Sequence, residues 1–166
     1  IQLLVLLLGS PIYSLSVTLV ALLISSGLGS LAIPRLERGF GGTRRVIAVA
    51  GLAVLVYVAL FVSFGAGITA AAVNTPFAGR ISVAILLTIP VGFCLGVFFP
   101  SGLKLIGCRH QDLISWAWGL NAGFTVLGSM SAILLAQFVG FSTILTTAGA
   151  IYILAIGSFA YLSKGF

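Results

Sequence analysis

The sequence has very few charged side chains for its length. Of its 166 residues, eight are Lys or Arg and two are Asp or Glu, whereas 60% are hydrophobic. A soluble domain carries roughly 25% charged residues, so ten charges cannot cover a water-exposed surface here. Lipid must surround most of the chain, and in lipid only helices or closed barrels satisfy the backbone. Long unbroken apolar runs favour helices. The sequence therefore predicts an all-α, polytopic transmembrane helical bundle.

Side chains that could carry acid–base or metal chemistry are equally scarce. The carboxylates are Glu37 and Asp112, the one imidazole is His110, and the thiols are Cys94 and Cys108. Catalysis usually needs ionisable groups close together, and these lie between the apolar runs or far apart. Neither cysteine has a His or Cys neighbour at ligand spacing. We therefore expect no catalytic residue, no cofactor and no metal site. Asp112 is expected to cap the helix that follows it.

The apolar runs predict the number of membrane crossings. A hydrocarbon core of about 30 Å requires about 20 helical residues. Five stretches reach that length, and they are residues 11–33, 46–66, 81–106, 113–138 and 142–162. Residues 1–8 are too short to span and predict a helical stub, which is either the end of a truncated helix or an interfacial segment. We expect residues 1–166 to form a single membrane domain, as a fragment of a longer protein.

The basic residues predict which side of the membrane each connection faces. If the five stretches all cross, seven basic residues fall on one side and only Arg80 on the other. The seven are Arg35, Arg38, Arg44, Arg45, Lys104, Arg109 and Lys164. Because positive residues accumulate in cytoplasmic loops, loops 34–45 and 104–112 and the C-terminus are expected to be cytoplasmic, in a multi-pass protein of the cell membrane. The partners expected are the lipid bilayer and other membrane helices. No basic face is present for nucleic acid.

Helix-packing signals concentrate in the third and fourth stretches. Pro90 lies inside the third stretch and predicts a kink, because it removes one backbone hydrogen bond and crowds the carbonyl of Leu86. Two pairs of glycines four residues apart predict close helix packing, because small residues let backbones approach in lipid. These pairs are Gly92 with Gly96 and Gly119 with Gly123.

Polar residues of the fourth stretch allow two interpretations. Asn121, Thr125 and Ser129 are four residues apart and share one helix face. They either form hydrogen bonds between helices, which is the default, or line a polar cavity. The cores of the five stretches contain no charged residue, which argues against an ion path. A broken helix at Pro90 would nevertheless suit a mid-membrane substrate site, so part of a small-solute transporter is the alternative function.

Three passages together resemble the integral-membrane region of spermidine-synthase-like membrane proteins. They are residues 6–31, residues 90–106 and residues 116–141, the last with Trp-Ala-Trp-Gly-x-Asn at 116–121. The resemblance implies a membrane module that lies C-terminal to a cytoplasmic, Rossmann-like aminopropyltransferase-type domain of the same parent chain, anchors it and forms a substrate path. The glycine loop and paired aspartates of that domain have no counterpart here, so no catalytic residue is carried over. Ser10 stands where the family pattern has His.

Overall fold

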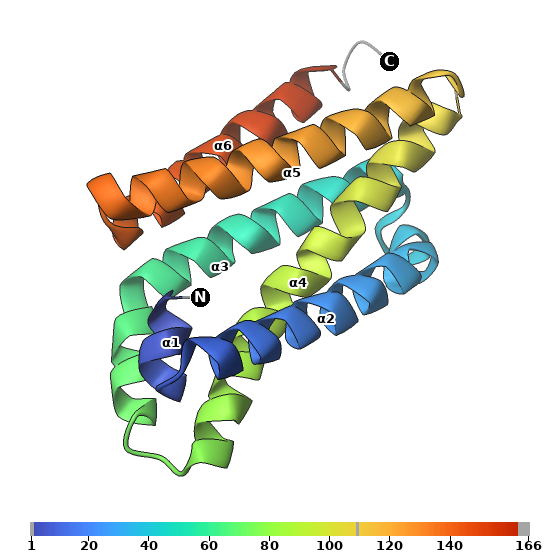
Figure 1. Cartoon of the computed structure of the whole chain (residues 1–166). Helices are drawn as coiled ribbons and strands as arrows, with labels where there is room; N and C mark the ends of the chain where they lie inside the picture. Colours follow the sequence, from blue (N-terminus) through green and yellow to red (C-terminus); the bar gives the residue numbers. More distant parts are fainter. Residues whose placement is uncertain (1, 109, 163–166) are drawn as a thin grey trace. The chain divides into compact units, whose positions relative to one another are not determined.

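The computed structural model describes residues 2–108 and 110–162 (Figure 1). Within these residues the chain forms six α-helices and no strand, which confirms the all-α prediction. The helices are α1 (Gln2–Leu8), α2 (Pro11–Phe40), α3 (Thr43–Ala72), α4 (Phe77–Gly107), α5 (Leu113–Phe138) and α6 (Phe141–Leu162).

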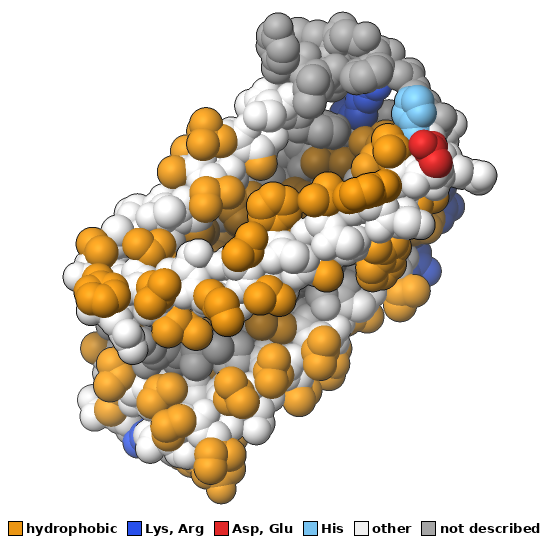
Figure 2. Space-filling model, turned by 45° about the horizontal axis from the view of Figure 1, so that its top comes forward, with side chains coloured by type: hydrophobic (Ala, Val, Ile, Leu, Met, Phe, Trp, Pro, Cys, Tyr) orange, Lys and Arg blue, Asp and Glu red, His pale blue; other side chains and the backbone are white. Residues whose placement is uncertain are grey.

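Four of these helices can cross a bilayer. By length and composition α2, α3, α4 and α5 each provide a membrane-spanning stretch, and α6 contains a shorter apolar stretch, Thr146–Ala155. Large hydrophobic side chains are exposed along these helices, and Figure 2 shows them spread over the visible face, with few charged side chains among them. Such a surface is stable in hydrocarbon and not in water. The chain is a helical membrane protein.

The connections are shorter than predicted, because the helices extend beyond the apolar stretches. Residues 34–45 were expected to be a loop, but α2 continues through Pro34 to Phe40 and α3 begins at Thr43. Pro34 removes only its own N–H bond, and Arg38 Nε donates to the Pro34 carbonyl at 3.2 Å. The helix ends where Gly41 adopts φ 76° and where the N–H groups of Gly41 and Gly42 both donate to the Glu37 carbonyl. Likewise α3 and α4 leave only residues 73–76 between them.

The chain divides into two compact units within α4. The N-terminal unit comprises residues 1–99 and the C-terminal unit residues 100–166. The helix α4 continues through Pro90 and Pro100. The kink expected at Pro90 stays a prediction, and so does the organisation of the chain as a single membrane domain.

The N-terminal unit contains two apolar clusters that hold its helices together. In this unit α1 packs against α2 and α3. One cluster consists of Leu4, Leu7, Leu8, Ala72 and Ala84, and the other of Ile33, Val46, Ala50 and Val97. Leu7 is fully buried in the first cluster, so the α1 stub is an integral part of this unit.

Small residues bring α2 and α4 into backbone contact. A Cβ atom added at Gly29 would fall within 3.0 Å of the Phe93 carbonyl group. A Cβ at Gly92 would meet Ser25 Oγ, and one at Gly96 would meet the backbone of Ser26. Because real Cβ atoms do not approach backbone atoms so closely, this contact between the two helices requires glycine at Gly29 and Gly96, whereas at Gly92 the close atom is the end of the Ser25 side chain.

In the C-terminal unit, α5 packs against α6 and has no buried residue of its own. A Cβ added at Gly119 or Gly123 would have open space within 4 Å, so this unit does not use them in packing, and their role stays a prediction. The capping role expected of Asp112 is wrong. Asp112 precedes α5, but its backbone is already helical (φ −60°, ψ −29°) and its carboxylate makes no capping hydrogen bond. An N-cap needs an extended backbone to turn its side chain onto the first free N–H groups.

We predict opposite effects for the same substitution at two glycines of α2. Gly29→Ala should lower the free energy of unfolding in detergent by about 1–3 kcal/mol, because the added methyl group collides with the Phe93 backbone. Gly27→Ala is the matched control, since nothing lies within 4 Å of its added Cβ, and it should leave stability equal or slightly higher. Denaturant titration of both purified variants measures the difference. Equal stabilities would show that α2 and α4 do not touch at Gly29.

Candidate functional site

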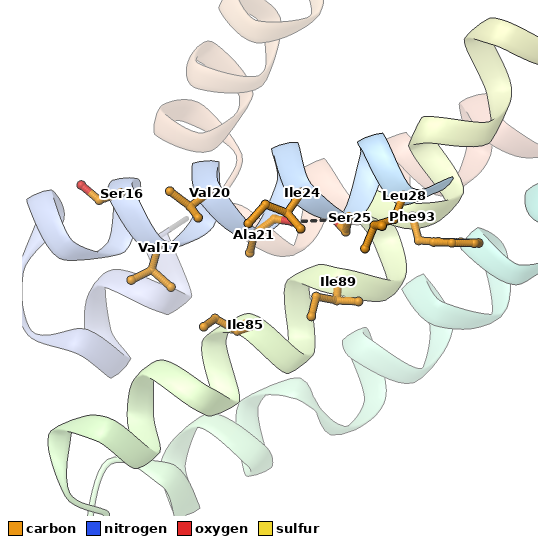
Figure 3. A pocket seen from close by; sticks show the side chains of 10 residues that line it. All are labelled: Ser16, Val17, Val20, Ala21, Ile24, Ser25, Leu28, Ile85, Ile89 and Phe93. Carbon is orange, nitrogen blue, oxygen red and sulfur yellow. Dashed lines mark hydrogen bonds between the residues drawn. The ribbon is translucent and has the colours of Figure 1, made fainter. Parts of the chain in front are cut away.

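An apolar groove lies between α2 and α4 in the N-terminal unit. Its volume is about 360 Å³ (Figure 3). From α4 it is lined by Ile85, Ile89 and Phe93. From α2 it is lined by Ser16, Val17, Val20, Ala21, Ile24, Ser25 and Leu28. Figure 3 shows the side chains of Ile85 and Ile89 directed from α4 towards α2.

Contacts between the two helices lie near both ends of the groove. At one end the rings of Tyr13 and Phe77 pack edge to face with their centroids 5.5 Å apart. At the other end Ser25 contacts Gly92. The contact partners advance in the same direction along both helices, so α2 and α4 run parallel. The groove is therefore an elongated slot between two joined helices.

The groove exposes only apolar surface, although two serines line it. The hydroxyl of Ser25 donates to the Ala21 carbonyl at 2.6 Å and is thereby satisfied within its own helix. The hydroxyl of Ser16 points away from the groove in Figure 3. A slot without an available donor or acceptor favours hydrocarbon and disfavours a polar or ionic solute.

Polar groups buried in the N-terminal unit are hydroxyls, and several bond to their own helix. Thr69 Oγ1 donates to the Gly65 carbonyl at 2.9 Å, and Thr88 Oγ1 donates to the Ala84 carbonyl at 2.7 Å. The Thr18 hydroxyl is buried and has no hydrogen-bond partner. Among the residues of this unit that the structure describes, the buried polar side chains are all serines and threonines.

Tyr57 links α3 to α4 next to Pro90, and the sequence did not single it out. Its hydroxyl donates to the Leu87 carbonyl of α4. Pro90 lacks the N–H that a helical residue would offer to the fourth preceding carbonyl, so α4 is short of one internal bond in this turn. The carbonyl left without that donor is that of Leu86, and the tyrosine hydroxyl binds the carbonyl of the next residue, Leu87. A tyrosine in the middle of an apolar run is the signal that could have revealed this contact, since a phenol hydroxyl within a membrane-spanning stretch needs a hydrogen-bond partner.

Four arginines surround the turn between α2 and α3, and we call Arg35, Arg38, Arg44 and Arg45 the basic turn. The turn is held by Glu37, whose carboxylate accepts a hydrogen bond from Thr43 Oγ1 at 2.5 Å. Arg45 Nη1 donates to the Phe40 carbonyl at 3.3 Å. At the opposite ends of α3 and α4 the unit carries only Arg80, whose Nε donates to the Thr75 carbonyl at 3.0 Å. The charge of this unit is thus concentrated at one end.

The predicted polar face of α5 is exposed in the C-terminal unit. Both hydroxyls form hydrogen bonds within α5. Thr125 Oγ1 donates to the Asn121 carbonyl at 2.7 Å, and Ser129 Oγ donates to the Val126 carbonyl at 2.9 Å. The side-chain amide of Asn121 has no hydrogen bond within the part of the chain that the structure describes. Helix packing and a polar cavity both stay open as roles for Asn121, Thr125 and Ser129.

The described part of the chain contains no cluster of side chains that could bind a metal ion. No group of three His, Cys, Asp or Glu side chains lies together there, and Cys94 and Cys108 are free thiols. Arg109 lies outside the described residues, as does Lys164.

No family model, curated protein or solved structure matches this chain. The resemblance to spermidine-synthase-like membrane proteins therefore stays a hypothesis.

We predict that Tyr57→Phe destabilises the protein by about 1 kcal/mol, because it leaves the Leu87 carbonyl without the tyrosine hydroxyl. Tyr13→Phe is the matched control. The Tyr13 ring packs against Phe77, but its hydroxyl makes no hydrogen bond in the described chain, so its removal should leave stability unchanged. Thermal unfolding of both variants in the same detergent gives the comparison. An unaltered Tyr57→Phe protein would rule out the bond to Leu87.

Proposed function

We propose that this chain is a multi-pass membrane module that keeps its basic turn in the cytoplasm and holds an associated cytoplasmic domain at the bilayer. The observation that carries this proposal is the concentration of four arginines at one end of an otherwise almost uncharged helical unit. Arginines at the membrane surface attract anionic lipid and remain on the cytoplasmic side during insertion.

The absence of candidate chemistry inside the described bundle supports a holding role. The buried polar groups are hydroxyls, and the groove between α2 and α4 is apolar. The resemblance to spermidine-synthase-like membrane proteins implies a cytoplasmic domain of the same parent chain as the partner. In this proposal the helices supply membrane attachment, and any aminopropyl transfer belongs to that domain.

The side of the membrane on which the basic turn lies is tested with single cysteines, introduced into a variant whose Cys94 and Cys108 are replaced by Ser. Gly39→Cys lies beside the basic turn, and Asn74→Cys lies in the connection between α3 and α4. In intact cells a membrane-impermeant maleimide should label Asn74→Cys alone, and Gly39→Cys should react only after permeabilisation. Both positions are exposed, so failure to react reports the membrane rather than burial. Labelling of the two cysteines from the same side would disprove the proposed orientation.

Solute transport is the second candidate, and the side-chain amide of Asn121 favours it. The amide lies about 12 Å along α5 from the start of the helix, and exposure of an unbonded amide to hydrocarbon is costly. A polar cavity would satisfy it, as would a partner helix.

If the chain is part of a transporter, we predict that solute counterflow depends on Asn121. Proteoliposomes would show counterflow of radiolabelled spermidine that Asn121→Leu abolishes and Asn74→Leu, the same change in a connection, preserves. Counterflow that is absent from the unsubstituted protein, or equal in the Asn121→Leu variant, would reject a spermidine path along this face of α5.

A further inference from the structure

The face of α2 that lines the groove continues to an arginine of the basic turn. At about 100° per residue, Arg35 lies about 20° from Ile24 and about 20° from Leu28 around the helix axis. Both of these apolar residues line the groove. Arg35 therefore lies on the same face of α2 as the groove residues, nearer to the C-terminal end of the helix.

The distance along α2 matches one leaflet of a bilayer. Arg35 follows Ile24 by eleven residues, which corresponds to about 16 Å of helix. Half of a hydrocarbon core of about 30 Å is about 15 Å. A lipid whose headgroup lies at Arg35 consequently places the end of its acyl chain at Ile24, inside the slot.

The guanidinium of Arg35 is available to a ligand. Arg35 is exposed and makes no hydrogen bond or ion pair in the described part of the chain. By contrast, Arg38 donates to Pro34 and Arg45 donates to Phe40. A free guanidinium in this position can bind a phosphate through two parallel N–H donors.

We propose that the groove binds one acyl chain of an anionic phospholipid whose phosphate is held by Arg35. The lining offers only apolar contacts, which suits a hydrocarbon chain, and the positive charge of Arg35 on the same face suits an anionic headgroup.

Photocrosslinking of the full chain in nanodiscs tests this proposal. The probes are phosphatidylglycerol and phosphatidylcholine with the same diazirine-bearing acyl chain, and mass spectrometry locates the crosslinks. Phosphatidylglycerol should label the peptides that contain residues 16–28 and 85–93 about fivefold more than phosphatidylcholine, as one surface arginine gives. Arg35→Gln should remove this preference, whereas Arg45→Gln on α3 should keep it.

A second pair of variants tests the groove itself. Ala21→Leu adds bulk inside the groove and should reduce crosslinking by both probes at these peptides, while Ala53→Leu on the exposed face of α3 should not. Arg35 is exposed, so its substitution tests the proposal even if Ala21→Leu impairs folding. Equal labelling by the two lipids, an unchanged preference in Arg35→Gln, or crosslinks confined to other helices would overturn it.

Discussion

The contact of α2 with α4 at small residues is the constraint on which the N-terminal unit depends. Ser25, Ser26 and Gly29 of α2 lie against Gly92, Phe93 and Gly96 of α4 at distances that leave no room for an added Cβ. In lipid the hydrophobic effect does not press helices together, so van der Waals contact between close backbones must do so. The contact also bounds one end of the groove, since Ser25 is both a groove residue and the partner of Gly92.

The nearly complete lack of charge inside the spans limits what this unit can do. Its buried hydroxyls bond mostly to carbonyls one turn back in the same helix, as Thr69 and Thr88 do. Such bonds satisfy polar atoms without linking them into a chain that could move a proton. In the lipid-binding mode proposed above, recognition depends on apolar shape within the membrane and on an arginine at its surface. The helix α2 carries both elements, since it provides one wall of the groove and Arg35.

Hydrophobic run length made the helices predictable, and their ends were less so. The five stretches correspond to α2–α6, since a run of about 20 apolar residues has few stable alternatives to a helix in lipid. The extension of α2 through Pro34 to Phe40 did not follow from run length, because the apolar run ends before Pro34 while the helix continues through polar residues. The failed cap at Asp112 depended on a local backbone conformation that residue type does not specify. Tyr57 was missed because its partner is a backbone carbonyl thirty residues away.

From sequence alone, the solvent and the secondary structure of this chain followed, because both depend on the balance of apolar and charged residues along continuous segments. Which glycines make contacts was decided only by the tertiary structure. Gly92 and Gly96 pack against α2, while Gly119 and Gly123, at the same spacing, have open space in their own unit. Spacing places two glycines on one face, but the neighbour that fills the gap comes from a distant part of the chain. The groove has the same origin, because its walls lie about seventy residues apart in sequence and meet only where two helices converge.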